Sequence, residues 1–273
     1  MAADVALLAP GVRRLIAPNP SLMTGPGTNT YLLGSDEIAV LDPGPAIAAH
    51  VESIVDATAG NVRWILVTHT HPDHSPGAAP LAARTGATLL GLPPPPGPHQ
   101  DATFAPQRVL ADGDVLELGD CVVDVVHTPG HASNHLCFRH RALDWLFTGD
   151  HVIDGSTVVI DPPDGDMRRY LESLAKIRAL DCRAIVPGHG NLIEDPRRVI
   201  DYIVAHRLER EAGVAAAIAA HPGLSSRELV PFVYRELDPK LHGWAERSLL
   251  AHALKLEADG VARADRGRWR IQS

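Results

Sequence analysis

The 273-residue sequence has few cysteines, no long apolar run and no excess of positive charge. Its three cysteines, Cys121, Cys137 and Cys182, lie far apart without a C-x-x-C pair, so we expect buried thiols in a reducing compartment and no disulfide framework. No apolar stretch has membrane-spanning length, and Met1 to Pro10 lacks the basic start and long apolar region of a secretory signal. These absences predict a cytoplasmic protein that does not enter a membrane.

The net charge of -8 argues against a general polyanion binder, because nucleic-acid affinity depends mainly on neutralising phosphates. The charge is uneven, however, since residues 213–273 hold nine Lys and Arg against seven Asp and Glu while the rest is acidic. The glycines lack the G-x-x-x-x-G-K-[ST] pattern, so no phosphate loop is predicted. A hydrophobic content of 45% supports one large domain, alone or with a small appendage.

The stretch from Thr68 to His74 places four potential metal ligands within six residues, directly after an apolar run. In an extended chain, side chains two apart point to the same side, so His69 and His71 can hold one ion together. Pro72 then bends the chain and directs the last two ligands elsewhere, which allows a second ion close by. A histidine-rich surface loop is the alternative, but this spacing after a buried strand favours a metal centre. The four ligands are His69, His71, Asp73 and His74.

The same arrangement recurs three times along the chain. Predicted strands at 122–126, 145–147 and 184–186 lead into T-P-G-H, T-G-D-H and P-G-H-G, which contribute His131, Asp150 and His189. Imidazole and carboxylate ligands without thiolate suit a hydrolytic Zn²⁺ site, although Mn²⁺ or Fe fit the same types. Seven ligands are too many for one tetrahedral ion. Two ions sharing Asp150 as a bridge would use all seven and leave room for a solvent molecule.

Hydrophobic periodicity predicts an α/β protein in which strands and helices alternate. The predicted strands are 12–17, 30–33, 38–41, 63–68, 115–118, 121–127, 135–138, 143–147 and 184–186, and the helices are 46–59, 78–85, from about 166, and 196–220. After residue 223 the rhythm changes to helices 226–237 and 242–258 and a hairpin of 261–263 with 268–271. This order predicts a winged-helix-like unit, with a helical cap on the larger domain as an equal alternative. We place the domains at 1–205 and 206–273.

The four motifs in this order resemble the metallo-beta-lactamase fold superfamily of metallohydrolases over the first 200 residues. The resemblance implies a four-layer αβ/βα sandwich with metals at one edge between the sheets. It implies that His69, His71 and His131 hold one ion, that Asp73, His74 and His189 hold the other, and that Asp150 bridges them. The segment Gly27 to Leu32 and the tail from His206 are similar to the subgroup typified by beta-lactamase-like protein 2, which has a C-terminal winged-helix-like domain. Some members of that subgroup are single-strand endoribonucleases.

The expected mechanism uses two Zn²⁺ ions per chain and a hydroxide that bridges them and attacks a carbonyl carbon or a phosphorus. Asp73 and Asp150 are the predicted catalytic residues, with Asp73 both binding metal and holding the proton of the nucleophile. For the general acid, His135 and His151 are candidates, but a supporting or surface role is favoured for each. Asp42, at the end of a strand, could orient a ligand histidine by accepting its second N–H, or serve as a turn or cap.

Three functions follow from these features. The favoured one is hydrolysis of a small ester, thioester or lactone, supported by the complete metal set and the acidic body, with a small-molecule partner rather than RNA or a membrane. A metal-dependent single-strand endoribonuclease is the alternative, because Trp269 and four arginines around the predicted wing could meet bases and phosphates. Packing of Trp269 in the core is the other interpretation of that cluster. A non-catalytic regulatory protein is weakest, since a structural zinc site needs only four ligands. The missing signal disfavours a true β-lactamase, and exposed helices could support a homodimer.

Overall fold

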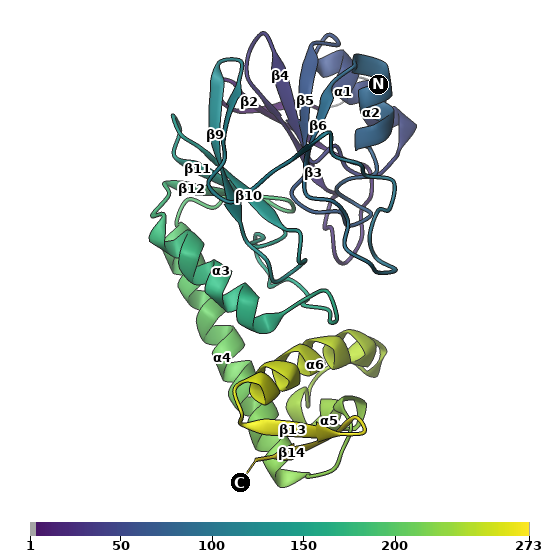
Figure 1. Ribbon diagram of the computed structural model, residues 1–273, viewed down its shortest axis with the longest axis vertical. Helices are drawn as coiled ribbons and strands as arrows, with labels where there is room; N and C mark the ends of the chain where they lie inside the picture. The colour runs from purple at the N-terminus through teal and green to yellow at the C-terminus, as the bar shows by residue number, and fades with distance from the viewer. Residues whose placement is uncertain (1–3, 273) are drawn as a thin grey trace. The chain divides into compact units, whose positions relative to one another are not determined.

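The computed structural model describes residues 4–272, and their contacts divide into two compact units. The first unit comprises residues 4–128, 134–156 and 180–196, and the second comprises 129–133, 157–179 and 197–272. Figure 1 traces the elements of both units along the chain. Among the described residues, no helix combines the length and the apolar character needed to cross a membrane. The domain boundary between residues 205 and 206 stays a prediction.

A seven-stranded sheet forms one half of the first unit, with its strands in sequence order. Its first four strands pair antiparallel, and β4 to β7 pair parallel. α1 connects β4 to β5, α2 connects β5 to β6, and a loop connects β6 to β7. The strands are β1 (Ala6–Ala9), β2 (Val12–Ile16), β3 (Asn29–Leu33), β4 (Ile38–Leu41), β5 (Val62–Leu66), β6 (Thr88–Gly91) and β7 (Arg108–Val109), and the helices are α1 (Ala48–Ala57) and α2 (Ala78–Thr85).

A five-stranded sheet in the order β12-β11-β10-β9-β8 forms the other half. Strands β8 to β11 pair antiparallel, and β12 joins β11 in parallel. The strands are β8 (Val115–Leu118), β9 (Cys121–His127), β10 (Leu136–His140), β11 (Trp145–Gly149) and β12 (Ala184–Pro187). The carboxyl ends of β11 and β12 are therefore neighbours, which brings two of the predicted ligand loops to one edge.

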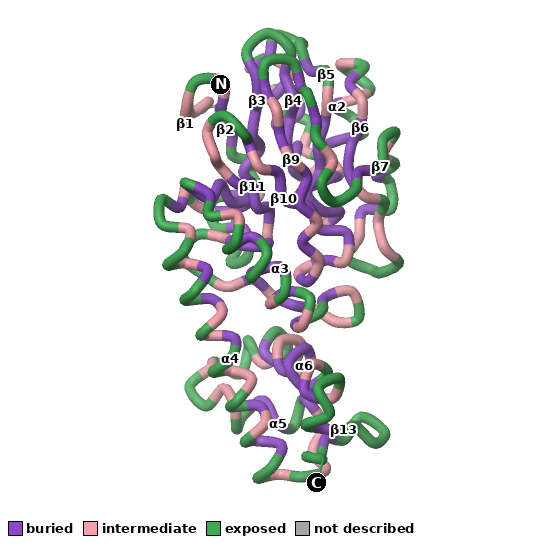
Figure 2. The backbone as a smooth tube through the Cα atoms, turned by 60° about the vertical axis from the view of Figure 1, so that its left-hand side comes forward, coloured by how far each residue is buried: buried purple, intermediate pink, exposed green. Residues whose placement is uncertain are grey.

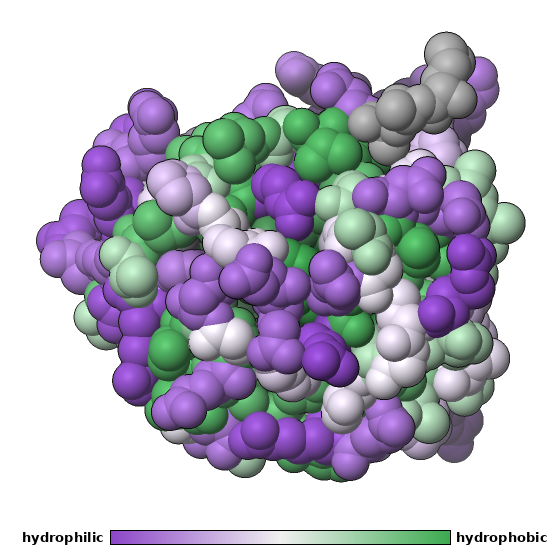
Figure 3. Space-filling model, turned by 90° about the horizontal axis from the view of Figure 1, so that it is seen from above, coloured by the Kyte–Doolittle hydropathy of each residue, from purple (hydrophilic) through white to green (hydrophobic). Residues whose placement is uncertain are grey.

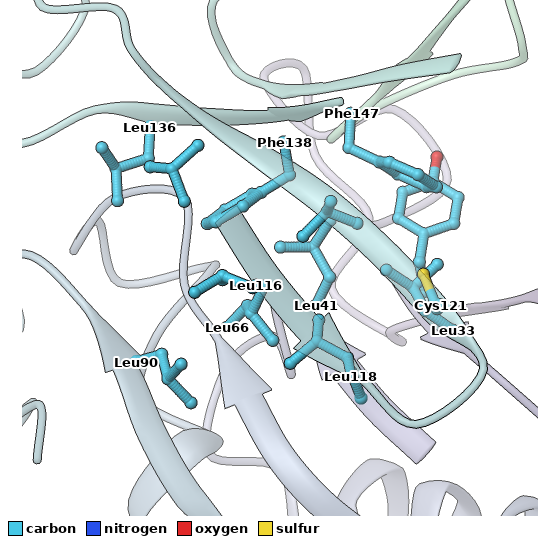
Figure 4. Close-up of a cluster of buried hydrophobic side chains, with 14 of the residues drawn as sticks. Leu33, Leu41, Leu66, Leu90, Leu116, Leu118, Cys121, Leu136, Phe138 and Phe147 are labelled. Carbon is cyan, nitrogen blue, oxygen red and sulfur yellow. The ribbon is translucent and has the colours of Figure 1, made fainter. Parts of the chain in front are cut away.

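The core of the first unit lies between the two sheets. Leu41 and Leu66 from the seven-stranded sheet pack with Phe138 and Phe147 from the five-stranded sheet, and all four are buried (Figure 4). The alternate residues of the seven-stranded sheet face the other way and pack against α1 and α2, as Val40 does with Ile54 in a second cluster. Figure 2 shows the resulting buried strands of this unit. The first unit thus contains one helix layer and two sheets of the predicted sandwich, and the predicted fold class is confirmed.

The second unit contains four helices and a hairpin. Its elements are α3 (Met167–Ala179), α4 (Pro196–Ala220), α5 (Ser226–Val233), a 3₁₀ turn (Pro239–Leu241), α6 (His242–Ala258), β13 (Ala262–Asp265) and β14 (Arg268–Ile271). Leu229, Leu249 and Trp269 share one buried core beneath the hairpin. A capping box between Ser225 and Glu228 starts α5. Two helices followed by a two-stranded wing confirm the winged-helix prediction.

Three short strands escaped the sequence analysis. β1, β6 and β7 were not predicted, and α5 ends at Val233 rather than at residue 237. β7 is only two exposed residues long, so its extended form depends on pairing with β6 rather than on its own pattern.

The surface in Figure 3 intersperses hydrophilic and hydrophobic residues, without a broad uniform patch on the face shown there.

Candidate metal centre

The predicted ligands of the first unit come from loops that follow β5, β11 and β12. Glycines make this convergence sterically feasible. A Cβ on Gly188 would lie 2.8 Å from Asp150 Oδ1 and 2.8 Å from His74 Cε1, and one on Gly149 would lie 2.5 Å from Thr68 Oγ1. Alanine at either position would therefore push a ligand or its support aside. Glycine at these two positions permits the close approach of the backbone to the ligands.

Four predicted ligands meet in one group. The ligand atoms of Asp73, His74, Asp150 and His189 lie within 4.8 Å of one another. His189 Nε2 is 3.2 Å from Asp73 Oδ2 and 3.2 Å from Asp150 Oδ1, and His74 Nε2 is 3.3 Å from the same Asp150 oxygen. Ligands of a tetrahedral Zn²⁺ with bonds of about 2.0–2.1 Å are separated by roughly 3.3 Å. The donor set and its spacing fit a divalent cation.

His74 gives the most direct indication that this group accommodates a cation. The ring is fully buried, and its Nε2 has no hydrogen-bond partner although it faces two carboxylates. Its Nδ1 is 2.9 Å from Asp42 Oδ2, and the Asp42 carboxylate also accepts from Thr68 N and Thr68 Oγ1, each at 2.7 Å. Because an acidic acceptor keeps a proton on Nδ1, Nε2 is the ring nitrogen that a cation between the carboxylates can bind. Asp42 therefore has the orienting contact considered from sequence.

His69 and His71 form a second pair of converging nitrogens. His69 Nε2 lies 3.0 Å from His71 Nδ1, and His69 Nδ1 lies 3.0 Å from the Thr68 hydroxyl. Since that hydroxyl donates to Asp42, it accepts the Nδ1 proton of His69, which turns the Nε2 lone pair toward His71. Two ring nitrogens at this separation suit a shared cation, as the alternation of side chains in an extended segment predicts.

His131 lies in the segment 129–133, which belongs to the second unit. Within that unit its Nδ1 is 2.8 Å from the carbonyl oxygen of Val159, so Nε2 is the nitrogen suited to binding a metal. The preceding Gly130 lies against Tyr170, because a Cβ there would meet Tyr170 Cα at 2.3 Å. The assignment of His131 to the ion of His69 and His71 stays a prediction from its motif.

The two general-acid candidates are buried. His135 and His151 are both 0% exposed. His135 Nδ1 lies 2.9 Å from Thr128 Oγ1, and its ring stacks on that of His69 with 5.0 Å between centroids. A proton donor to a leaving group must reach the substrate, which a fully buried ring does not. The structure therefore favours the supporting role for both residues.

Charge balance in the group also points to a cation. Burial lowers the pKa of His189, but the carboxylates of Asp150 and Asp73 outweigh burial and raise that pKa to about 10. Burial raises the pKa of Asp150, but His189 and His74 outweigh it and hold that pKa well below its usual range. The carboxylates thus stay ionised and favour positive charge beside them. A bound divalent cation would take the place of the imidazole protons.

Several residues that were not predicted from the sequence support the ligand loops. The Asn29 side chain donates to the carbonyl oxygens of Pro187 and Gly190 at 3.0 and 2.9 Å, and Tyr31 donates its hydroxyl to Pro187 O at 2.6 Å. Both residues lie in the Gly27 to Leu32 segment. The family resemblance of that segment was recognised from the sequence, but the contacts that its side chains make were not predicted. Asp101 and Ser75 form another support, for which the sequence offers no local pattern.

The wing of the second unit divides into a core face and a solvent face. Trp269 is 2% exposed, and its Nε1 donates to Ser226 Oγ at 2.9 Å. The hypothesis that this ring stacks on bases is therefore wrong, and the core interpretation is confirmed. On the opposite face, exposed Arg263 is paired across the strands with exposed Arg270.

The comparisons with known proteins agree with this architecture. Residues 23–189 match the model of the metallo-beta-lactamase superfamily, and residues 225–269 match that of the beta-lactamase associated winged helix domain. A Drosophila melanogaster protein named beta-lactamase-like protein 2 homolog is 32% identical over 96% of this chain and 93% of its own length. An Aspergillus fumigatus protein named atrochrysone carboxyl ACP thioesterase is 32% identical over 79% of this chain and 67% of its own length.

Solved structures show the same fold. A beta-lactamase domain protein from Burkholderia ambifaria has a TM-score of 0.82 and 26% identity, covering 99% of this chain and 94% of that one. A metallo-beta-lactamase family protein from Thermus thermophilus has a TM-score of 0.81 and 22% identity, covering 97% and 100%. With its motif order, its two sheets and its winged helix, the chain belongs to the metallo-beta-lactamase superfamily and is a metallohydrolase with an associated winged-helix domain.

Proposed function

We propose that the chain is a dinuclear metal-dependent hydrolase of a small thioester, ester or lactone. The observation that carries this proposal is the convergence of Asp73, His74, Asp150 and His189 in one group with ligand spacing. His69 and His71 would hold the second ion, with His131 as its third ligand by motif, and Asp150 would serve as a ligand to both ions. Zn²⁺ is the proposed metal because the donors are imidazole and carboxylate, and Mn²⁺ or Fe are alternatives.

The two carboxylates of the group have different surroundings, which supports different roles. When bound, two divalent cations would lower the pKa of a water between them and polarise the bond to be cleaved. The Asp73 side chain is 28% exposed, whereas that of Asp150 is 13% exposed. We therefore assign Asp73 to orient the attacking water and accept its proton, because it is the carboxylate that solvent and substrate can reach. We assign Asp150, which is more enclosed, to keep His74 and His189 in position.

The thioester is the substrate class with the most support. The Aspergillus fumigatus relative, similar over four fifths of this chain, has a name that describes a thioesterase. The net charge of -8 also offers little attraction to a polyanionic substrate. A carbonyl substrate needs a polarising cation and a positioned water, both of which the donor set can provide.

Hydrolysis of a panel of acyl thioesters, lactones and single-stranded RNA by zinc-loaded protein tests the proposal. We expect thioester turnover, and we expect it to fall by at least about 100-fold in Asp73→Asn, as is typical when an acid–base group is lost. Asp36→Asn, which changes an exposed carboxylate in a turn, should retain full activity. Asp150→Ala should bind fewer ions per chain. Full activity with one ion per chain would exclude the dinuclear mechanism, and full activity in Asp73→Asn would exclude the assigned role.

A single-strand endoribonuclease is the second candidate, and the solvent face of the wing favours it. Arg263 and Arg270 are directly opposite across β13 and β14, although like charges in that position repel. A phosphate bound between them would relieve the repulsion. RNA cleavage that is lost in Asp73→Asn and weakened in Arg263→Ala and Arg270→Ala would support this candidate over the thioesterase. RNA cleavage that is unaffected by the two arginine variants would exclude a role for the wing.

A further inference from the structure

We propose that Asp101 is a positioning residue of the metal centre, acting through Thr70 and Ser75 without binding metal. This inference rests on the proposed metal-dependent function. Asp101 lies in the loop between β6 and β7, about thirty residues after the ligand motif, and is 9% exposed. Its place in the first unit is fixed by hydrogen bonds to both ends of that motif.

Asp101 brackets the segment that contains the ligands His71, Asp73 and His74. Its backbone N–H donates to the carbonyl oxygen of Thr70 at 2.7 Å, immediately before the segment. Its Oδ2 accepts from Ser75 Oγ at 2.7 Å, immediately after it. One residue thus holds the two ends of the segment at a fixed separation.

The bracket is itself anchored. The other carboxylate oxygen of Asp101 accepts from Thr103 N at 2.9 Å and from the Thr103 hydroxyl. Phe104, which follows, is 3% exposed and belongs to the core beside α2. Asp101 therefore has little freedom to follow a movement of the ligand segment, so the contact constrains the segment rather than the reverse.

The proline-rich loop participates in the same network. The Asn134 side chain donates to Thr70 Oγ1 at 2.8 Å and to the carbonyl oxygen of Pro93 at 3.2 Å. Thr70 Oγ1 in turn donates to Gln100 Oε1. Thr70 is buried and lies between two ligand histidines. It is linked to the loop of residues 92–104 twice, through Asn134 to Pro93 and directly to Gln100. The run of prolines restricts that loop, which gives the network a stiff support.

The need for such a support follows from the demands of metal binding. A ligand constellation must be held within about 0.5 Å, and outer-shell partners typically change metal affinity 10–100-fold. Asp42 holds His74 by its ring, but Asp73 lies at the exposed side of the turn. The Asp101 bracket is the device that limits the path of the backbone on which Asp73 is carried.

Four variants test the inference, with Co²⁺ as the metal probe. Ser75→Ala and Asp101→Ala should each weaken Co²⁺ affinity about tenfold and alter its visible absorption spectrum, because the segment is released. Asp101→Asn should restore both, since its oxygen can accept from Thr103 and its amide can donate to Ser75. Thr85→Val is the matched control, because it removes a threonine hydrogen bond of the same unit, that to the carbonyl oxygen of Leu81 in α2, which does not involve the ligand segment.

The outcomes separate this inference from the proposed function. If the Ser75→Ala and Asp101→Ala proteins have the affinity and spectrum of the parent, the bracket does not position the metal and the inference is overturned. The same holds if Thr85→Val reduces affinity as much as Ser75→Ala, because the effect is then one of general stability. A parent protein that binds no metal would instead overturn the proposed function. Ser75→Ala, a small change, keeps the test decisive if Asp101→Ala does not fold.

Discussion

Substitution of Asp42 by asparagine should weaken metal binding while the fold is kept. Asp42 accepts three hydrogen bonds, from Thr68 N, Thr68 Oγ1 and His74 Nδ1, and is 2% exposed. It also has a φ of 50°, a conformation that asparagine tolerates and alanine does not. Asp42→Asn therefore changes hydrogen bonding and leaves the backbone unstrained.

The expected loss follows from the tautomers of the histidines. If the asparagine oxygen accepts from Thr68 N, its amide group must donate to His74 Nδ1, which moves the His74 proton to Nε2. The Thr68 hydroxyl, which then also accepts from the amide, can turn its proton to His69 Nδ1 and shift that ring as well. Both nitrogens that should bind metal would carry protons. A 10–100-fold loss of affinity is expected, or about 1.4–2.8 kcal/mol.

Chelator competition for Zn²⁺ measures this loss, and ¹⁵N spectra of the metal-free protein report the tautomers. Asp101→Asn is the matched control, because that carboxylate accepts from partners that an amide can also satisfy. Wild-type affinity for both ions in Asp42→Asn would show that the carboxylate does not set the tautomers. So would a His74 ring that keeps its Nδ1 proton.

Four further changes have defined outcomes. Gly188→Ala should reduce zinc affinity because its Cβ would lie 2.8 Å from a ligand oxygen, whereas Gly213→Ala, with open space around it inside α4, should raise the free energy of unfolding by about 0.5–1 kcal/mol. Burial lowers the pKa of His50 to about 4, so between pH 6.5 and 4 only the unfolded state binds this proton. The free energy of unfolding therefore decreases as the pH is lowered through this range. His50→Gln should therefore remove about 3 kcal/mol of that pH dependence in urea titrations of metal-free protein. Trp269→Phe should lower the free energy of unfolding by about 1–2 kcal/mol in the same assay, since it removes the bond to Ser226.

Helix ends that are marked by glycine or proline could be predicted to the residue. α2 ends at Gly86, which takes the left-handed conformation, and α4 begins at Pro196, where proline is favoured in the first turn. β1, β6 and β7 have no such signals, and their extended form comes from neighbours in the sheet. Register with a distant strand is information that a short segment does not carry.

The candidate site shows the same division. Ligands could be identified because each follows a buried strand, a pattern local to a few residues, and because His131, Asp150 and His189 each come directly after glycine. The bracket of Asp101 could not, because it depends on the path of the loop of residues 92–104. Asp42 is intermediate. Its strand-end position suggested an orienting role, but only the fold brings it to His74.

The second unit restricts how an RNA could bind to it. On α6, Arg247 pairs with Asp161 at 2.8 Å and Lys255 with Glu211 at 2.7 Å, so these cations are neutralised within the unit. The wing presents another basic surface, in which Arg268 also donates to a carbonyl oxygen. Three wing arginines are then available for phosphates, Arg263, Arg266 and Arg270. Each phosphate contact to a single strand contributes about -0.7 to the dependence of log affinity on log salt, so wing binding predicts a slope no steeper than roughly -2. A steeper slope would require contacts beyond the wing, whereas a thioesterase that leaves RNA unbound would show none.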